Sequence, residues 1–360
     1  MNIINTISEE QYHSYDGVNY SLLSALVDGP QFYAAKKIAG ESDTPAIILG
    51  SVVDMLLTDV DKFDKTVYVM TANKPGSELM QTFCEIFAET GNQESAREGS
   101  GFKIGTDAIM KKFDKEGRNY YNALIAGQGK MIIDADGLFR ANAIVKELTE
   151  NPFTKKYFVK EPDVDLLFQV PIEWNAQFKS LTDNKFCTMS SKSMLDVIKI
   201  DHVAKTIQPV DLKTGAEGFM KSYWRYKRYL QASMYTDAVI NSTWDKINIE
   251  YSIEPLIFVY ADSNLKFKPV IYKSTLKDIY VGRAGVDYIE PLLMSYTKKD
   301  NPTSEADSIT WGTLGQTKRK GYQRLVAELD WHIKNDIWDY DYDTYINDGE
   351  KDINAFGVKL

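Results

Sequence analysis

A group of polar side chains in the second half of the chain has the composition and order of a hydrolytic metal site. Its members are Asp196, Asp211, Lys213, Gln231 and Tyr235. Carboxylates are hard oxygen ligands, and Mg²⁺ or Mn²⁺ binds to such ligands while keeping several of its own waters. A divalent ion can polarise a phosphate ester and acidify the water that attacks it. Lys213 would position that water or stabilise the charge that develops on the phosphate.

The segments around the two carboxylates predict strands that pair. Along Val210-Asp211-Leu212-Lys213, the alternation of a strand puts Asp211 and Lys213 on one face and the apolar residues on the other. The segment from Met194 to Ile200, which contains Asp196, alternates in the same way. The polar stretch from Lys199 to Thr206 predicts a tight hairpin turn, and pairing would bring Asp196 close to Asp211. The alternative is a structural Asp–Lys ion pair, because a short motif is only a hypothesis.

A third carboxylate, Asp54, lies in the apolar stretch from Ala46 to Leu57, which predicts a buried helix. A carboxylate in such a helix needs a cation, a hydrogen-bonding network or a metal as its partner. Gly50, one turn earlier, would allow a close approach of another backbone. We therefore expect Asp54 to be a metal ligand, and the alternative is a tie between the helix and a backbone.

The following segment, from Glu217 to Ile240, predicts a helix. Gln231 and Tyr235 are four residues apart and therefore share a face of it. Side chains near this face are expected to hold a nucleic-acid backbone, and they are Trp224, Arg225, Lys227 and Arg228. The alternative is a packed helix whose aromatic residues face the core.

These residues, together with the N-terminal sequence, resemble the exodeoxyribonuclease VIII-like (RecE-type) branch of the RecB-type PD-(D/E)xK nucleases of phages and prophages. The N-terminal match covers Tyr12-His13-Ser14-Tyr15-Asp16-Gly17-Val18, Ser21-Leu22-Leu23 and Gly29-Pro30-Gln31-Phe32-Tyr33. Leu49-Gly50-Ser51-Val52-Val53-Asp54 matches the first catalytic helix. At its last position the family usually carries a histidine ligand, whereas this chain has Asp54, which can also bind Mg²⁺.

The resemblance assigns roles to the motif residues. Lys192-Ser193-Met194-Leu195-Asp196 matches the Lys-x-x-x-Asp of the family, which implies that Lys192 lies near a substrate phosphate. The implied metal ligands are Asp54, Asp196, Asp211 and the carbonyl of Leu212, and the implied catalytic lysine is Lys213. The aromatic spacing and the Gln-x-x-x-Tyr of the next helix are matched by Phe219, Tyr223, Tyr226, Gln231 and Tyr235. Some relatives carry an acid on the strand before Asp196, and that strand here offers Gln169 and Glu173.

The activity implied by the resemblance is Mg²⁺-dependent digestion of duplex DNA ends, with Mn²⁺ as a substitute. A 5′-to-3′ direction, a role in phage recombination or DNA metabolism, a single-strand annealing protein as partner and a ring-shaped homo-oligomer are implied by analogy only. Two other functions stay open. One is a nuclease fold that binds DNA or protein without cutting, and the other is an endonuclease or an end-processing enzyme like the CRISPR-associated relatives.

Composition limits the remaining classes. The two cysteines, Cys84 and Cys187, cannot supply the four ligands of an iron–sulfur cluster or a zinc ribbon. No apolar run reaches the roughly 18–20 residues of a membrane helix, and the N terminus lacks the basic start and apolar core of a signal peptide. We therefore expect a cytoplasmic protein of the bacterial host with no membrane partner.

The formal net charge of −9 is unfavourable for a DNA-binding protein, because phosphate contacts need cations. Basic residues are nevertheless concentrated in two segments, 212–229 and 317–324. Such clusters favour a focused positive groove, and the alternative is that each is a solvated helix face.

The expected architecture is an α/β or α+β protein with a restriction-endonuclease-like PD-(D/E)xK core, in which helices flank a mixed central sheet. This core is expected over residues 131–335, with a helical part of the same domain over 1–60. Residues 61–130 match the family least and form a variable insert, which either grips DNA or a partner or only decorates the core. Within it, the polar stretch from Thr90 to Asp107 predicts a mobile loop. The acidic, aromatic tail over 336–360 is expected to be loosely packed or to dock on a basic surface.

The expected elements of the core can be given in chain order. They are a helix over Asp134–Thr149, strands between Asp165 and Lys213, a strand pair over Ile247–Tyr260 and Phe267–Lys273, and helices over Leu276–Lys298 and Gln316–Asn335.

Overall fold

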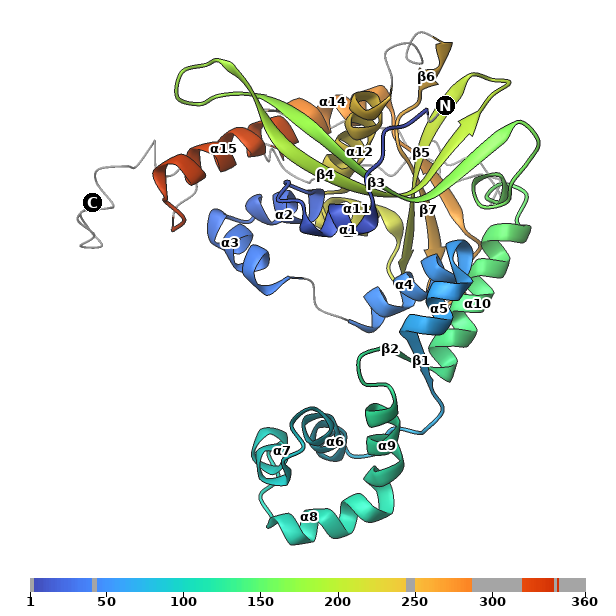
Figure 1. The fold of residues 1–360 in the computed structure, drawn as a ribbon, viewed down its shortest axis with the longest axis vertical. Coiled ribbons are helices and arrows are strands. Elements are labelled where there is room, and N and C mark those ends of the chain that lie inside the picture. Colours follow the sequence, from blue (N-terminus) through green and yellow to red (C-terminus); the bar gives the residue numbers. More distant parts are fainter. Residues whose placement is uncertain (1–2, 41–43, 244–249, 287–318, 340–341, 343–360) are drawn as a thin grey trace, which may run out of the picture.

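The computed structural model describes residues 3–40, 44–243, 250–286, 319–339 and 342. Its centre is a six-stranded mixed sheet with the order β3-β4-β5-β7-β8, and the short strand β6 (Ser252–Ile253) lies beside β5 (Figure 1). Helices pack on both faces of this sheet. The prediction of an α/β core with a mixed central sheet flanked by helices is therefore confirmed.

The first three strands of the sheet form an antiparallel meander. They are β3 (Val164–Lys179), β4 (Phe186–Asp201) and β5 (Thr206–Gly215). The predicted hairpin turn lies between β4 and β5, where Asp201 accepts hydrogen bonds from the two backbone N–H groups that follow His202. β7 (Ile257–Asp262) then runs parallel to β5, and β8 (Val270–Lys273) runs antiparallel to β7.

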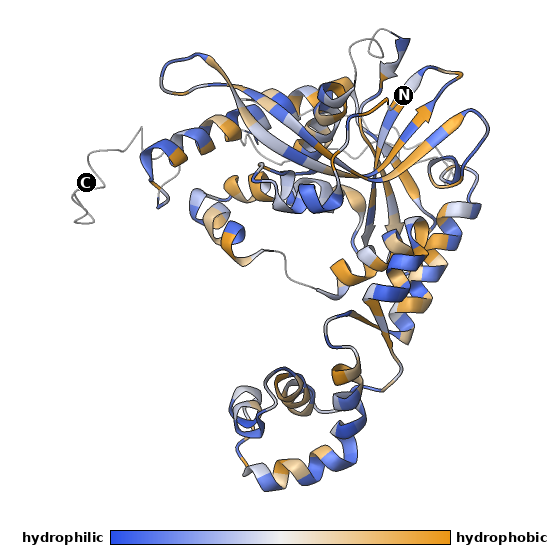
Figure 2. Cartoon of the chain, viewed as in Figure 1, coloured by the Kyte–Doolittle hydropathy of each residue, from blue (hydrophilic) through white to orange (hydrophobic). Residues whose placement is uncertain are grey.

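Separate sets of helices cover the two faces of the sheet. On one face, α12 (Arg228–Ser242) and α15 (Tyr322–Asn335) pack against β3. On the other face, α4 (Pro45–Thr58) packs against β5, and α10 (Ala135–Glu150) packs against β7. β7 is apolar and buried along nearly its whole length, as expected for a strand with helices on both sides. Figure 2 shows the apolar character of α4, the helix predicted around Asp54.

Short capped helices precede α4. α1 (Glu9–Ser14) begins with a capping box, and α2 (Tyr20–Leu26) begins with an asparagine cap. α3 (Pro30–Ala39) and α4 each have a proline in the first turn, where its missing N–H leaves no bond unmade. α2 packs against α12 and α15, so the N-terminal helices lie on the face of the sheet opposite to α4.

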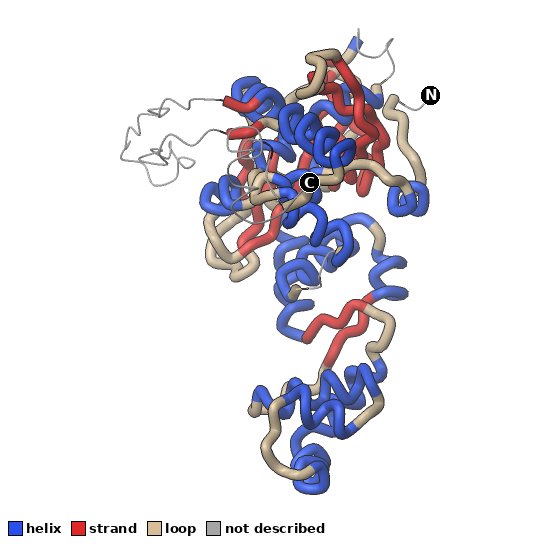
Figure 3. The backbone as a smooth tube through the Cα atoms, turned by 90° about the vertical axis from the view of Figure 1, so that its left-hand side faces the viewer, coloured by secondary structure: helices blue, strands red, loops and turns tan. Residues whose placement is uncertain are grey.

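Residues 71–130 form a helical lobe at one end of the molecule (Figures 1 and 3). α5 (Val60–Thr66) leads into β1 (Val67–Met70), which pairs in parallel with β2 (Met131–Asp134) and so links the lobe to the core. The helices of the lobe are α6 (Glu78–Thr90), α7 (Gln93–Ser100), α8 (Thr106–Lys112) with the π-turn Phe113–Gly117, and α9 (Arg118–Ala126). They enclose an apolar cluster of their own.

The prediction of a loop from Thr90 to Asp107 is wrong in the middle of this stretch, where α7 lies. Asn92 caps this helix by accepting from the N–H groups of Glu94 and Ser95, and Ala96 is fully buried. Few apolar side chains are needed to hold so short a helix in a lobe, so its polar sequence resembled a loop.

The helix predicted over 217–240 is divided in two. α11 (Phe219–Arg225) ends at Tyr226, and α12 begins at Arg228. Between them Lys227 has a left-handed backbone conformation with φ of 52°, and the hydroxyl of Tyr20 donates to the carbonyl of Tyr226. The division therefore depends on a tertiary contact with α2, which periodicity does not reveal.

The C-terminal predictions are only partly covered by the described residues. The strand predicted over 247–260 is interrupted at Pro255, between β6 and β7, and its first residues lie outside the description. Of the helix predicted over 276–298, the structure describes α14 (Leu276–Ala284), which is followed by β9 (Gly285–Val286). β10 (Arg319–Lys320) pairs with β9, and most of the tail lies outside the description. No helix in the described segments is long and apolar enough to cross a membrane.

Candidate active site

The faces of the β3–β4 ladder exchange where Gln169 lies opposite Asp196, two residues that are not themselves paired in the ladder. Phe168 pairs with Val197, and Val170 pairs with Leu195, so the register is continuous across this point. Gln169 itself has a φ of 47°, the left-handed region that a non-glycine residue in a strand rarely adopts. This conformation lets the two strands exchange their faces without changing their partners.

The burial pattern shows the exchange directly. Leu195 belongs to the apolar cluster under α12, whereas Val197 belongs to the cluster under α4, although both are odd-numbered residues of β4. Ile198 is again in the cluster under α12. The predicted strict alternation from Met194 to Ile200 is therefore wrong at Asp196, since the kink at Gln169 reverses the faces there. Asp196 consequently lies at the crossing between the two sides of the sheet.

Asp211 and Lys213 lie on β5 and share the face toward α12, while Val210 and Leu212 pack in the opposite cluster. Asp211 is 1% exposed, and its Oδ1 accepts a hydrogen bond of 2.7 Å from Nε2 of Gln231. The ammonium of Lys213 lies 2.5 Å from the other oxygen, Oδ2. The structure thus brings these three predicted residues together, with Asp211 held between an amide and a cation.

Asp196 joins this group from β4. The backbone N–H of Leu212 donates to its Oδ2 at 2.7 Å. Burial and, to a smaller extent, the negative charge of Asp211 raise the pKa of Asp196 to about 7, while Lys213 opposes the shift. The carboxyl group is therefore held where its charged form is unfavourable unless a cation is added.

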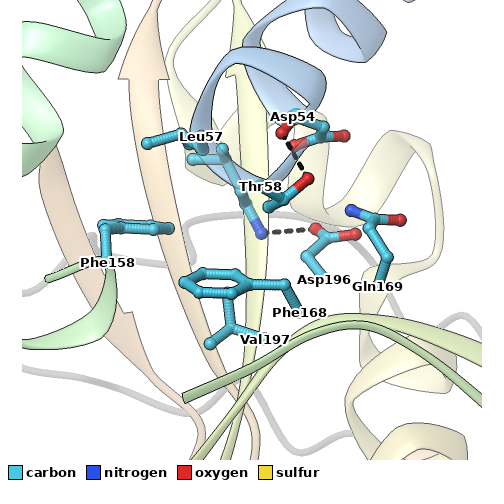
Figure 4. A pocket seen from close by; sticks show the side chains of 9 residues that line it. Asp54, Leu57, Thr58, Phe158, Phe168, Gln169, Asp196 and Val197 are labelled. Atoms are coloured by element: carbon cyan, nitrogen blue, oxygen red, sulfur yellow. Dashed lines mark hydrogen bonds between the residues drawn. The ribbon is translucent and has the colours of Figure 1, made fainter. Parts of the chain in front are cut away.

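Asp54 reaches the same place from α4, on the other side of the sheet (Figure 4). A Cβ atom at Gly50 would lie 3.2 Å from Oγ1 of Thr214, so the expected close approach of this helix to β5 is present. Burial raises the pKa of Asp54 well above its usual value, and the nearby carboxylate of Asp196 adds to this rise. Lys213 lowers it in part, which places all of these charges within reach of one another.

A small hollow lies between α4 and the reversed segment of the ladder (Figure 4). One part of its wall is polar, and the rest is formed by aromatic and aliphatic side chains. The lining residues are Asp54, Leu57, Thr58, Phe158, Phe168, Gln169, Asp196, Val197 and Leu212.

The donor set fits a hard divalent cation. Three carboxylates crowd around one lysine, and burial, with a further contribution from the neighbouring carboxylates, raises the pKa values of Asp54 and Asp196. In the described part of the chain, however, no three acidic, histidine or cysteine side chains are already arranged to hold a metal ion. Binding would therefore need side-chain adjustment together with water or a carbonyl oxygen. The predicted contribution of the Leu212 carbonyl stays a prediction.

Tyr235 completes the α12 side of the site. Burial raises its pKa well above the usual value, and the charges of Asp211 and Asp196 raise it further. The phenol therefore lies beside the carboxylates and stays protonated. The Gln-x-x-x-Tyr spacing places both side chains toward β5, as their shared helical face predicted.

The cations predicted to contact DNA differ in what surrounds them. Lys192 donates to the carbonyls of Tyr12 and Tyr15 at 2.9 and 2.6 Å, so it holds the end of α1. Lys227 pairs with Asp28 at 2.6 Å. Arg225 lies 3.4 Å from Glu217. The aromatic residue predicted with these cations, Trp224, stacks on Tyr229 and Arg319. The last predicted cation is Arg228. Contact with nucleic acid stays a prediction for all five residues.

The sequence offered Gln169 and Glu173 on the strand before Asp196 without deciding between them. The structure puts Gln169 in the wall of the hollow, whereas Glu173 is exposed opposite Lys192. The kink itself gave no signal, because glutamine is not among the residue types that favour a left-handed conformation. Phe158, which follows the 3-10 turn Lys155–Tyr157, and Phe168 of β3 were also missed, since aromatic residues usually indicate core.

Comparison with known proteins finds similarity among solved structures alone. No model of a known protein family matches the chain, and no curated protein matches it. Among solved structures, the chain is similar to the crystal structure of a "putative exonuclease" from Eubacterium rectale, with 14% identity and a TM-score of 0.40. The similarity covers 76% of this chain and 80% of that one.

Replacing Asp196 by asparagine should stabilise the metal-free protein. The substitution removes a charge but keeps an acceptor for the N–H of Leu212. Because the folded pKa of about 7 lies above the unfolded value of about 3.9, the wild type loses stability as pH rises between these values. Thermal unfolding should thus show no gain for Asp196→Asn at pH 4 and a gain on the order of 1–3 kcal/mol at pH 8.

The matched control is Asp201→Asn. Backbone N–H groups lower the pKa of Asp201, so its charge is stabilising and the same substitution should destabilise the protein. Added Mg²⁺ should raise the unfolding temperature of wild type and of Asp201→Asn, but not that of Asp196→Asn. A less stable Asp196→Asn protein at pH 8 would contradict the charge crowding described above.

Glycine and valine substitutions at Gln169 should change the free energy of unfolding in the opposite direction from the same substitutions at Gln177, an exposed position on the same strand. Glycine adopts the φ of 47° without strain, so Gln169→Gly should keep or raise stability, by about 1 kcal/mol. Gln169→Val should lower it by at least about 1 kcal/mol, since a β-branched residue fits this conformation poorly. At Gln177, glycine should destabilise and valine should not. Equal effects at the two positions, measured by denaturant unfolding, would show that β3 has no kink.

Proposed function

We propose that this chain is a divalent-metal-dependent nuclease that hydrolyses phosphodiester bonds of DNA. The observation that carries the proposal is the group formed by Asp54, Asp196 and Asp211 around the ammonium of Lys213. A carboxylate cluster with one lysine and no excess of cations is poorly suited to structural stabilisation, because its charges do not balance. It is well suited to hold Mg²⁺ beside a phosphate.

The three carboxylates would hold the metal, whose chemistry is to polarise the phosphate and acidify a bound water. Asp54 and Asp196 would release their protons when the cation binds, since ligands must be deprotonated. Gln231 keeps Asp211 in place by its hydrogen bond of 2.7 Å. Lys213 would exchange part of its contact with Asp211 for the attacking water or the phosphate oxygen, and stabilise the charge formed there.

The finer parts of the proposal rest on the family resemblance alone. They are an exonuclease that degrades duplex ends from 5′ to 3′ with Mg²⁺ or Mn²⁺, in phage recombination, with a single-strand annealing partner and a ring-shaped oligomer. A binding module that does not cut is the second candidate. It is favoured by the absence, among the described residues, of three side chains already arranged around a metal position.

The nuclease proposal predicts metal-dependent loss of end-labelled linear duplex DNA, with closed circular DNA left intact. EDTA should abolish digestion. Lys213→Ala should reduce the rate by about 10²–10³-fold, because it removes the cation that faces the developing charge. The readout is product release on gels over time with Mg²⁺ and with Mn²⁺.

The chain contains a matched control for this substitution. Asp183 and Lys185 form another Asp-x-Lys ion pair, with 2.9 Å between them, in the exposed turn between β3 and β4. Lys185→Ala should therefore digest DNA at the wild-type rate. Cutting of the circle would identify an endonuclease. No cutting by folded wild type with either metal would overturn the enzyme and leave the binding module.

A further inference from the structure

Arg228 occupies an unusual position at the edge of the carboxylate group. It is the first residue of α12, directly after the left-handed Lys227. Its guanidinium lies 5.3 Å from the ring centroid of Tyr226 and 6.0 Å from that of Phe219. Two aromatic rings therefore hold the cation in place and remove part of its hydration.

Among the described residues, Arg228 forms no ion pair, and its buried Nε has no hydrogen-bond acceptor. Each of the other predicted DNA-contacting cations has an oxygen partner: Lys192 has the carbonyls of α1, Lys227 has Asp28 and Arg225 has Glu217. A buried donor without an acceptor is costly. In the part of the chain that the structure describes, Arg228 thus has a donor without an acceptor.

The surroundings of Arg228 indicate which acceptor it would take. Burial and Asp211 raise the pKa of Asp196, while Lys213 and, more weakly, Arg228 lower it, so the guanidinium lies within electrostatic reach of the carboxylates. No side chain caps the first turn of α12, and the positive end of a helix favours an anion. The guanidinium fork matches phosphate oxygens. Gln231, the partner of Asp211, lies about 4.5 Å further along the same helix.

We propose that Arg228 binds a phosphate of the DNA strand adjacent to the phosphate that is cut. This inference rests on the proposed nuclease function and specifies how the strand is held there. The rings of Phe219 and Tyr226 fix the guanidinium, and the bound phosphate accepts from its terminal N–H groups. Arg228 then sets the position of the strand relative to Asp211 and Lys213.

The test measures binding of a fluorescent 20-base-pair DNA duplex with Ca²⁺ in place of Mg²⁺, so that cutting does not interfere. Arg228→Met removes the charge but keeps an unbranched apolar side chain over the rings. We expect about fivefold to tenfold weaker binding. The slope of log Kd against log salt should fall by about 0.9, as for the loss of one phosphate contact.

Arg140→Met is the matched control, because it removes one positive charge from α10, where Arg140 pairs with Asp136 at 3.0 Å. It should leave both the affinity and the salt slope unchanged. Arg228→Gln keeps a polar end in the same place and should show the same loss of slope as Arg228→Met. If Arg228→Met does not fold, the salt slope of Arg228→Gln tests the phosphate contact in its place.

The outcomes separate this inference from the proposed function. Folded Arg228 variants with the wild-type affinity and slope, beside a wild type that digests DNA, would overturn the role of Arg228 alone. A wild type that neither binds nor cuts the duplex would overturn both. An equal loss of slope in Arg140→Met would show that the effect is one of net charge, and would also overturn the role of Arg228.

Discussion

The reversal of the β3–β4 ladder at Gln169 and Asp196 is the constraint on which the site depends. A regular ladder would give every residue of β4 a fixed face, and α4 and α12 would remain on separate sides of the sheet. Because the faces exchange at this point, Asp196 lies between the two sides. Asp54 then approaches from α4, and Gln231 and Tyr235 approach from α12. One strained backbone conformation thus joins two otherwise separate layers.

The joined layers bring together charges that do not balance. Asp211 is well paired by Gln231 and Lys213, but Asp54 and Asp196 lie half-buried beside it and their pKa values are raised. A protein selected for stability alone would replace such carboxylates by apolar residues. Strain in Gln169 and repulsion among the carboxylates occur together, as is usual where a site has been kept at the expense of stability.

The sequence predicted the local parts of this arrangement well. The faces of Asp211 and Lys213, the β4–β5 turn, the apolar α4 helix and the shared face of Gln231 and Tyr235 follow from periods of two and 3.6 residues. The mixed sheet with helices on both faces also followed from the order of elements.

The predictions that failed depend on contacts between distant segments. The break at Lys227 is held by Tyr20, and α7 is held within the lobe by a few buried residues. The kink at Gln169 lies between the apolar clusters on the two sides of the ladder, and no residue type in the sequence indicates it.

The most direct test of the account is the location of Mn²⁺ in crystals of the protein. Anomalous scattering should show a manganese peak bounded by carboxylate oxygens of Asp54, Asp196 and Asp211, with Lys213 beside it. The peak should be lost in Asp211→Asn crystals. A peak elsewhere, or none at this position in wild-type crystals soaked at millimolar Mn²⁺, would contradict the claim that the reversed ladder builds a metal site.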